Sequence, residues 1–335
     1  MGFVVVQIDE ATDLGPFTYE EATLAAAGGE LRAYDVTDPE DVPKVAADAD
    51  VVWLGWDPAL TKDLLARLPR CRLAIRWGVG HEQIDSAGAT ELGIAVANAP
   101  TYGSEDVAEH AIALLLASAK RVVWAHEQIR AGGWPSAVAG TVHRIKGQTL
   151  GIIGVGRIGS ATARRGLGLG MRVIGYDNAR PDHELRAMGV EPVDLATLAA
   201  QADHVSVHVP YSPSSHHLVD AALIEAFKPG MILVNTSRGK VLDQGAVVAA
   251  LHSGKLRAAA LDVFDPEPPA VDDPVRSAPN IILTPHHASW SDEAMEGLRA
   301  EMCRTTIDFM TTGWAEPIVN PQVRDRLKPA GTRRP

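Results

Sequence analysis

Residues 149–159 read TLGIIGVGRIG, and this stretch decides the fold. A short apolar run leads into three glycines, Gly154, Gly156 and Gly159, and a helical pattern follows them. A second apolar run covers residues 172–176 and ends at Asp177, 18 residues after the third glycine. Such a glycine motif is weak evidence by itself. Here, however, the glycines follow an expected strand and precede a helix, and a second strand then ends at an acidic residue. This order predicts a βαβ unit that binds a dinucleotide.

Each glycine has a separate physical task in such a unit. Gly154 allows the tight turn, Gly156 lets backbone amides approach the pyrophosphate, and Gly159 lets the helix lie close to the strand. The amino end of the helix supplies N–H donors to the phosphates. Asp177 is expected to accept hydrogen bonds from the ribose hydroxyls and to repel a 2′-phosphate, which favours NAD over NADP. Arg180, three residues beyond it, would weaken that preference.

Composition narrows the class of protein. The chain has 335 residues, which suggests about two domains at roughly 150 residues each. A net charge of −11 argues against nucleic acid as the principal partner. The two cysteines, Cys71 and Cys303, form neither a disulfide framework nor a zinc motif, which suits a reducing compartment. No signal peptide and no apolar run of about 20 residues is seen, so we expect a cytoplasmic protein without a membrane span.

Two series of alternating strands and helices predict an α/β fold with two doubly wound domains. The first series has apolar runs at 2–9, 50–55 and 73–77, and one long helix is expected over residues 105–130. A glycine-rich segment, 132–147, precedes the second series. The expected strands of that series are 149–153, 172–176, 204–209, 231–235, 259–263 and 281–284. A last helix, over 291–310, follows the second series, and we expect it to return to the first domain.

Three polar segments follow strands of the second series, where open α/β sheets place their ligands. They contain Arg238, Glu267 and His286. A guanidinium grips a carboxylate in a bidentate manner, and an imidazolium protonates a developing alkoxide. A neighbouring carboxylate orients the imidazole. The three residues therefore form a coherent acid–base set.

With these motifs assembled, the sequence resembles the D-isomer-specific 2-hydroxyacid dehydrogenase family, in its branch of phosphoglycerate dehydrogenases and C-terminal binding proteins. The likeness covers about residues 45 to 320. The matching segments are GVGRIG at 154–159, HVP at 208–210, NTSRG at 235–239, DV at 262–263, EP at 267–268 and TPH at 284–286, with GVG at 78–80, ID at 84–85 and VAE at 107–109 upstream.

The resemblance implies a reaction and a domain plan. His286 would protonate the carbonyl of a 2-oxo acid, Glu267 would hold His286, and Arg238 would bind the substrate carboxylate and carbonyl. NADH would deliver hydride to C2 and the product would be the D-2-hydroxy acid. The presence of Glu267 argues against formate dehydrogenases, which carry an amide there. An NAD-binding domain, 100–289, would be inserted into a discontinuous flavodoxin-like substrate domain, 1–99 and 290–322, followed by a flexible tail, 323–335.

The resemblance also implies the residues that contact the cofactor. They include the glycine loop, the acidic residue after the second strand, and positions that follow the other strands. The expected set is Gly154, Gly156, Arg157, Ile158, Gly159, Asp177, His208, Val209, Pro210, Thr236, Ser237, Asp262 and Ser104. Ordinary packing is an equal explanation for Val209 and Pro210.

The expected substrate loop departs from the family pattern. The family has an Asp-Asn pair where this chain has Glu82 and Gln83, but the N–H groups of Val79 and Gly80 can still form an anion-binding nest. Arg76 matches an arginine of the same branch. Together with Arg238 it would suit a substrate with a second anionic group, such as phosphate or phosphonate, whereas a structural ion pair is the alternative.

The same sequence motifs are compatible with two other functions. An NADH-sensing, corepressor-like interaction protein and a phosphite dehydrogenase share the same motifs. No metal site is expected, and His287 is taken as a supporting or surface residue. The family implies a homodimer in which residues 121–147 form an arm on the partner. Trp124 and Trp134 are candidate anchors of this arm, and burial in the core is an equal explanation for both.

Overall fold

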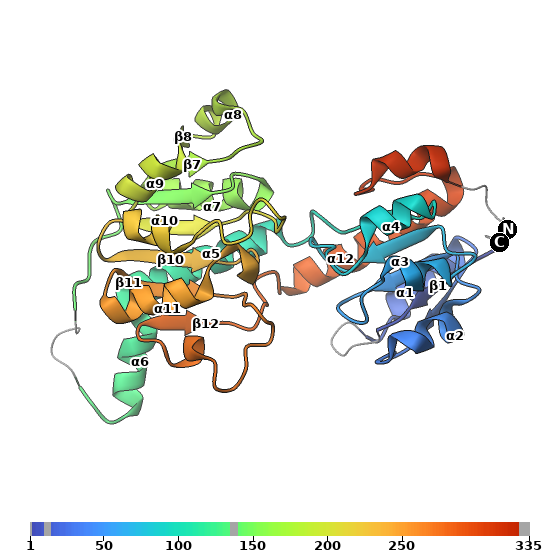
Figure 1. Ribbon diagram of the computed structural model, residues 1–335, viewed down its shortest axis with the longest axis horizontal. Coiled ribbons are helices and arrows are strands. Elements are labelled where there is room, and N and C mark those ends of the chain that lie inside the picture. Colours follow the sequence, from blue (N-terminus) through green and yellow to red (C-terminus); the bar gives the residue numbers. More distant parts are fainter. Residues whose placement is uncertain (1, 10–14, 135–139, 328–335) are drawn as a thin grey trace. The chain divides into compact units, whose positions relative to one another are not determined.

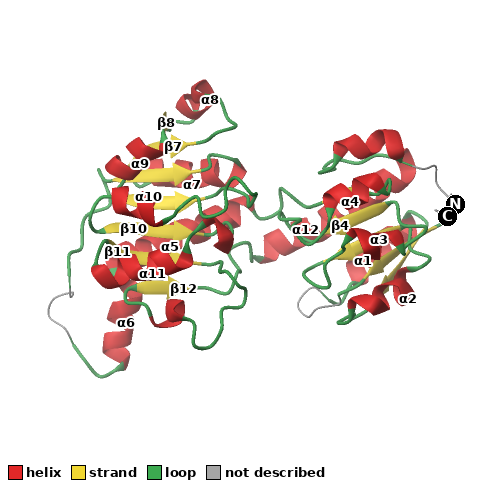
Figure 2. Cartoon of the chain, in the orientation of Figure 1, coloured by secondary structure: helices red, strands yellow, loops and turns green. Residues whose placement is uncertain are grey.

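The computed structural model describes residues 2–9, 15–134 and 140–327, and it has two compact units (Figure 1). Unit 1 comprises residues 1–103 and 291–335, and unit 2 comprises residues 104–290. Both units have parallel sheets and flanking helices, so the α/β class is confirmed (Figure 2). None of the described helices combines the length and the apolar character needed to cross a membrane.

Unit 1 has a five-stranded parallel sheet in the order β2-β1-β3-β4-β5, the flavodoxin-like order. Its strands are β1 (Phe3–Gln7), β2 (Gly29–Ala33), β3 (Val51–Leu54), β4 (Leu73–Arg76) and β5 (Ala95–Ala97). Its helices are α1 (Thr18–Ala26), α2 (Val42–Ala46), α3 (Lys62–Ala66), α4 (Ser86–Glu91) and α12 (Asp292–Thr312), with 3-10 turns at Pro39–Asp41 and Pro321–Arg326.

The last helix completes the core of unit 1. The Ser291 side chain caps α12 by accepting from the Ala294 N–H group, and Gly313 ends the helix at a φ of +82°. Met302 and Phe309 are fully buried in the same apolar cluster as Val5 of β1. A second apolar cluster lies on the other face of the sheet, under α2, α3 and α4. The carboxyl-terminal helix is therefore an integral part of this unit.

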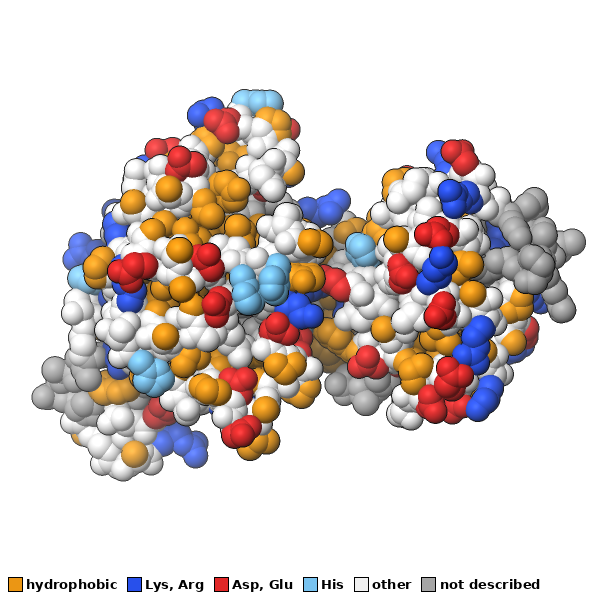
Figure 3. Space-filling model, in the orientation of Figure 1, with side chains coloured by type: hydrophobic (Ala, Val, Ile, Leu, Met, Phe, Trp, Pro, Cys, Tyr) orange, Lys and Arg blue, Asp and Glu red, His pale blue; other side chains and the backbone are white. Residues whose placement is uncertain are grey.

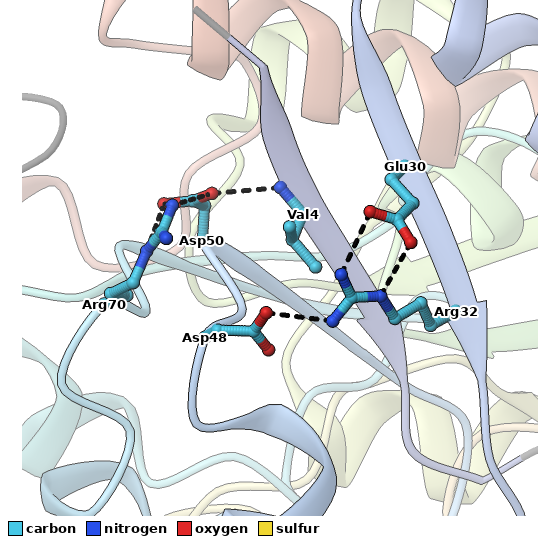
Figure 4. A network of polar contacts seen from close by, with 6 residues as sticks. All are labelled: Val4, Glu30, Arg32, Asp48, Asp50 and Arg70. Atoms are coloured by element: carbon cyan, nitrogen blue, oxygen red, sulfur yellow. Dashed lines mark hydrogen bonds and ion pairs between the residues drawn. The ribbon is translucent and has the colours of Figure 1, made fainter.

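Charged side chains tie the strands of unit 1 together at one edge (Figure 4). Arg32 donates to Glu30 and to Asp48, at 2.8 and 2.9 Å. The buried Asp50 accepts from the Val4 N–H group and from Arg70. The solvent-exposed pairs of Arg32 contribute at most about 1 kcal/mol each, so the apolar clusters carry most of the stability of the unit.

Unit 2 has a seven-stranded parallel sheet in the order β12-β11-β10-β9-β6-β7-β8, the dinucleotide-binding order extended by one strand. Its strands are β6 (Thr149–Ile153), β7 (Arg172–Tyr176), β8 (Glu191–Pro192), β9 (His204–Val207), β10 (Met231–Asn235), β11 (Leu256–Leu261) and β12 (Ile281–Leu283). Its helices are α5 (Ser104–Lys120), α6 (Val122–Arg130), α7 (Arg157–Gly168), α8 (Asp182–Ala187), α9 (Leu195–Gln201), α10 (Ala221–Ala226) and α11 (Gln244–Ser253), with 3-10 turns at Gly239–Val241 and Pro274–Ser277.

Helices cover both faces of this sheet. Helices α5 and α7 pack over one apolar cluster, which includes Leu115, Ile152 and Val234. Helices α9, α10 and α11 pack over the other, which includes Leu198 and Leu233. Because all strands are parallel, their carboxyl ends lie at one edge, and the sheet order reverses between β6 and β9 at that edge. Ligands of such sheets bind at this reversal.

Several predictions about single elements are wrong. The helix expected over 105–130 is two helices, because Arg121 has a left-handed backbone with φ of +56°. The strand expected over 204–209 ends at Val207, and the strand expected over 259–263 is displaced to Leu256–Leu261. Strands β2, β5 and β8 were not predicted, because they are short or polar.

Part of the expected tail is folded. Residues 321–326 form a 3-10 turn, and Val323 is fully buried in the apolar cluster of unit 1. The buried Asn320 just before it donates to the Ile94 carbonyl and accepts from the Val96 N–H group. The expectation of a flexible tail from 323 is therefore wrong up to residue 327, and residues 328–335 lie outside the described residues.

Lys, Arg, Asp and Glu side chains are interspersed over the face drawn in Figure 3. A protein that binds a phosphate backbone usually gathers its basic residues on one face. The described side chains of this view show no such gathering.

Candidate active site

The glycine loop of unit 2 joins β6 to α7. Gly154 has a φ of +90°, and a Cβ atom on it would lie 2.7 Å from Val209 Cγ1. A Cβ on Gly159 would lie 2.0 Å from the carbonyl oxygen of Gly154, so only glycine lets α7 come this close to the turn. A Cβ on Gly156 would meet no heavy atom within 4 Å. Gly154 and Gly159 therefore allow close contacts that a Cβ atom would block, and Gly156 leaves open space at the start of α7.

The first turn of α7 suits a bound anion. Its N-cap residue is Gly156, which has no side chain to accept from the first N–H groups, whereas Asp, Ser or Thr side chains cap several other helices. Arg157 and Ile158, two of the expected cofactor contacts, begin this helix. Uncapped N–H groups at the amino end of a twelve-residue helix are natural donors to phosphate.

Asp177 follows the end of β7 and faces the glycine loop. Its carboxylate accepts from the N–H groups of Val155, at 2.7 Å, and Arg180, at 2.8 Å. The Arg180 guanidinium donates to Ser160 Oγ and lies 3.5 Å from Glu184. The Asp177 carboxylate thus fastens the glycine loop to the end of β7. Ser160 and Glu184 hold the guanidinium of the nearby Arg180.

Three expected cofactor contacts carry buried polar atoms without a hydrogen-bond partner among the described residues. The atoms are Ser104 Oγ, His208 Nδ1 and Thr236 Oγ1. Leaving a buried polar atom unpaired costs about 1–3 kcal/mol, so such atoms are usually satisfied by a ligand or water. These residues therefore fit the polar groups of a dinucleotide.

The imidazole of His208 is neutral. Burial lowers its pKa to about 3, and Nε2 lies 2.8 Å from Ser206 Oγ. Val209 packs beside Gly154, and Pro210 lies exposed further along the same loop. This loop follows β9, the strand next to β6 at the reversal of the sheet order.

The loop after β10 fixes the place of Arg238. Buried Asn235 accepts from the N–H and hydroxyl groups of Ser237 and donates to the Arg238 carbonyl. A Cβ on Gly239 would lie 1.8 Å from the Phe264 carbonyl oxygen, so this position tolerates only glycine. The half-buried Arg238 guanidinium donates to the Ser237 carbonyl.

Glu267 and His286 are in direct contact. Glu267 Oε2 lies 2.8 Å from His286 Nδ1, and Oε1 accepts from the Phe264 N–H group at 2.7 Å. Burial by itself would raise the pKa of Glu267. The hydrogen bond and charge of His286, the Phe264 N–H group and the charge of Arg238 outweigh burial and lower it. Glu267 therefore stays ionised beside His286 and orients its imidazole ring through Nδ1.

Asp262, expected at the cofactor, holds the turn that carries His286. It is fully buried at the end of β11. Its carbonyl oxygen accepts from the His286 N–H group at 2.8 Å, and its carboxylate accepts from the N–H groups of His287 and Ala288. Its carboxylate also accepts from the Thr284 hydroxyl. This one side chain thus organises the whole turn.

One group of side chains has the composition of a metal site. One ligand atom from each of His110, Asp262 and His287 lies within 4.8 Å of the others. Two histidines and a carboxylate suit several transition metals. Both Asp262 oxygens, however, already accept hydrogen bonds from Thr284, His287 and Ala288. The hydrogen bonding of this carboxylate is thus satisfied without an ion.

Of the expected substrate residues, Arg238 lies in unit 2, in the loop after β10. Arg76 is the last residue of β4 in unit 1, and Val79 and Gly80 lie in the loop that follows it. Gly78 has a φ of +124°, and a Cβ on it would lie 1.9 Å from an Arg76 nitrogen. Arg76 is 6% exposed, donates to the Trp77 carbonyl and lies 4.5 Å from the centre of the Trp56 ring. Asn98 donates to the Val79 carbonyl. The loop that contains Val79 and Gly80 is therefore fixed from both sides.

Sequence reasoning missed two residues that shape the site. Asn235 had been quoted only as part of a motif, although it builds the Arg238 loop. His110 was not singled out, and its Nε2 atom lies 3.1 Å from Thr284 Oγ1. It is one of several polar residues in the first turns of α5, and such residues are too common to indicate a role.

Known proteins resemble this chain in sequence and in fold. The family profile "D-isomer specific 2-hydroxyacid dehydrogenase, NAD binding domain" matches residues 112–288. A glyoxylate reductase from Korarchaeum cryptofilum is 39% identical over 280 residues, which cover 82% of this chain and 83% of that protein.

Two further relatives extend the comparison. A D-3-phosphoglycerate dehydrogenase from Methanocaldococcus jannaschii is 36% identical over 307 residues, covering 90% of this chain but only 58% of that protein. The chain thus spans little more than half of that relative. The crystal structure of D-lactate dehydrogenase from Aquifex aeolicus, complexed with NAD and lactic acid, superimposes with a TM-score of 0.82 at 28% identity, covering 98% of this chain and 99% of that one.

Proposed function

The chain belongs to the D-isomer-specific 2-hydroxyacid dehydrogenase family, and we propose that it reduces a small 2-oxo acid to the D-2-hydroxy acid with NADH. The observation that carries the proposal is the 2.8 Å contact between His286 Nδ1 and Glu267 Oε2 in a unit with a dinucleotide-binding loop. An imidazole held this way, near a guanidinium, suits general acid catalysis on a carbonyl.

Three residues of unit 2 have separate roles in the proposed reaction. His286 holds a proton at Nε2 and gives it to the carbonyl oxygen of the substrate. Ionised Glu267 orients the ring through Nδ1 and stabilises its protonated form. Arg238 binds the substrate carboxylate and polarises the carbonyl. When bound, NADH supplies the hydride to C2.

We propose that NADH is preferred over NADPH. The Asp177 carboxylate is fixed beside the glycine loop, where it would accept from ribose hydroxyls and repel a 2′-phosphate. Arg180, which could bind that phosphate, is engaged by Ser160 and Glu184. This arrangement supports the preference, which the ratio of the NADH and NADPH dissociation constants would measure.

We propose further that Arg76 contacts a second anionic group of the substrate. Its guanidinium is almost fully buried beside the Gly78–Gly80 loop and lies over Trp56. The Arg76→Ala variant should raise the KM of phosphohydroxypyruvate by at least about tenfold, since a charge-assisted hydrogen bond contributes about 1.5–3 kcal/mol. The KM of glyoxylate should change little. Equal effects on both substrates would assign Arg76 to the structure alone.

The experiment that tests the reaction follows NADH absorbance with glyoxylate, hydroxypyruvate, phosphohydroxypyruvate and phosphonopyruvate. We expect turnover with at least one of them, reduced by about 100-fold or more in His286→Ala. The His252→Ala variant, at an exposed histidine on α11, is the matched control and should keep most of the activity. Tight NADH binding without turnover would contradict the proposal and favour an NADH-sensing protein. NADH formation from NAD and phosphite would identify phosphite oxidation instead.

We propose that the chain works as a homodimer. Helix α6 has no buried residue, and it exposes Val122, Val123 and Ile129. Trp134, beyond its end, is 87% exposed. Exposed apolar side chains gathered on one short segment are typical of a protein interface. Light scattering of the wild type and of a Val122→Glu, Ile129→Glu variant would test this, and an unchanged mass would exclude the segment.

A further inference from the structure

A chain of polar contacts links helix α5 to the turn that carries His286. His110 Nε2 lies 3.1 Å from Thr284 Oγ1, and the Thr284 hydroxyl donates to Asp262 Oδ1. A carboxylate only accepts, so the single hydroxyl hydrogen of Thr284 is directed to Asp262. The Thr284 oxygen must therefore accept from His110. This requires the neutral His110 ring to carry its proton on Nε2 rather than Nδ1.

Asp262 transmits this contact to the backbone around His286. His286 has a φ of +51°, in the left-handed region that is unfavourable for a residue with a Cβ atom. The Asp262 carbonyl oxygen accepts from the His286 N–H group, and the carboxylate accepts from the next two N–H groups, of His287 and Ala288. These three bonds hold the turn in its unfavourable conformation.

The surroundings of His110 suit a fixed, neutral donor. Its side chain is 22% exposed. Burial lowers the pKa of His110, Asp262 opposes this effect, and His287 adds to it. The ring of His287 meets that of His110 edge-on at 5.1 Å. The imidazole is thus held between Thr284, Asp262 and His287.

We propose that His110 is a positioning residue: its Nε2–H group fixes Thr284, Thr284 fixes Asp262, and Asp262 holds His286 against Glu267. His110 contacts Thr284 and His287, and it acts on His286 through the turn that Asp262 holds. The effect of His110 on kcat rests on the proposed reductase function, in which His286 donates the proton. The series of hydrogen bonds from His110 through Thr284 to Asp262, called the relay below, does not depend on that function.

The kinetic experiment compares His110→Leu, Thr284→Val and the double variant. One neutral hydrogen bond contributes about 0.5–1.5 kcal/mol, so each single variant should lower kcat by about 2- to 10-fold. The double variant should be no slower than the slower single one, because both act through Asp262. The KM for NADH should stay within about twofold. His110→Gln, which keeps an N–H donor of similar reach, should restore kcat.

His252→Leu is the matched control, because His252 is an exposed histidine on α11 whose ring bonds within its own helix. It should leave kcat unchanged. An unchanged kcat in His110→Leu, additive losses in the double variant, or no rescue by glutamine would overturn the proposal. Loss of wild-type activity on addition of EDTA would also overturn it, since it would assign the three side chains to a metal ion.

A second measurement does not depend on turnover. Nitrogen-15 NMR of the histidine side chains should show His110 as the neutral form protonated at Nε2, and Thr284→Val should change that signal selectively. A proton on Nδ1 would overturn the relay even in an active enzyme. If the wild type turns over no 2-oxo acid but shows the Nε2–H form, the proposed function fails and the relay stands.

Discussion

Adding one methyl group at Gly159 should disrupt both the fold and the cofactor site of unit 2. In Gly159→Ala the new Cβ would lie 2.0 Å from the carbonyl oxygen of Gly154, where ordinary contacts lie at 3.4–4 Å. Helix α7 must therefore withdraw by about 1.4 Å from the turn. Overpacking of this kind costs about 1–3 kcal/mol. For a unit of this size, that lowers the melting temperature by about 3 to 10 °C.

The same displacement moves the first N–H groups of α7 away from a bound pyrophosphate. Losing one hydrogen bond to a charged group costs about 1.5–3 kcal/mol, which weakens NADH binding by about 10- to 150-fold. Thermal unfolding and titration of NADH fluorescence measure the two effects separately. Both should appear together, because one movement of the helix causes them.

Gly168→Ala is the matched control in the same helix. A Cβ there meets no heavy atom within 4 Å and the backbone φ is not positive, so alanine should keep or slightly raise the melting temperature. Its NADH affinity should equal that of the wild type. If Gly159→Ala also melts and binds like the wild type, the close approach of α7 to the turn is not a requirement of this fold, and the reasoning fails.

Three other predictions follow from single contacts. Glu267→Gln keeps a hydrogen-bond acceptor for His286 but not the charge, and should lower kcat by about 5- to 30-fold with both KM values nearly constant in steady-state kinetics. A larger change in the KM for NADH would contradict the assignment. Asp177→Ser should raise NADPH affinity relative to NADH by about tenfold or more in binding titrations, because it removes the repulsive carboxylate. Burial lowers the pKa of His208 to about 3, so its contribution to stability is full above pH 6.5 and is lost as the pH falls toward 3. His208→Gln should therefore show a shallower fall in melting temperature between pH 6.5 and 4 than the wild type or the exposed-site control His183→Gln.

The sequence predicted some parts of this protein much better than others. The βαβ unit around Gly154 was recognisable because strand, turn and helix are neighbours in the chain and each has a local signature. The break at Arg121 was not, because an apolar helical pattern runs through it and only the left-handed backbone reveals the end of α5. Strand β2, with the residues GELRA, lacks the apolar run that marks the inner strands. Its pairing with β1 makes it a strand.

In the candidate active site, too, the sequence predicted some features and the tertiary structure decided others. By itself, the sequence determined which candidate catalytic residues follow strand ends, Arg238, Glu267 and His286, because strand periodicity and residue type are local properties. Only the tertiary structure decided that Glu267 meets His286 at Nδ1, and that His110, far away in the chain, bonds to Thr284. Such contacts depend on how the strands order themselves in the sheet and how α5 packs on it. That order results from burying apolar faces across the whole unit, which no local pattern contains.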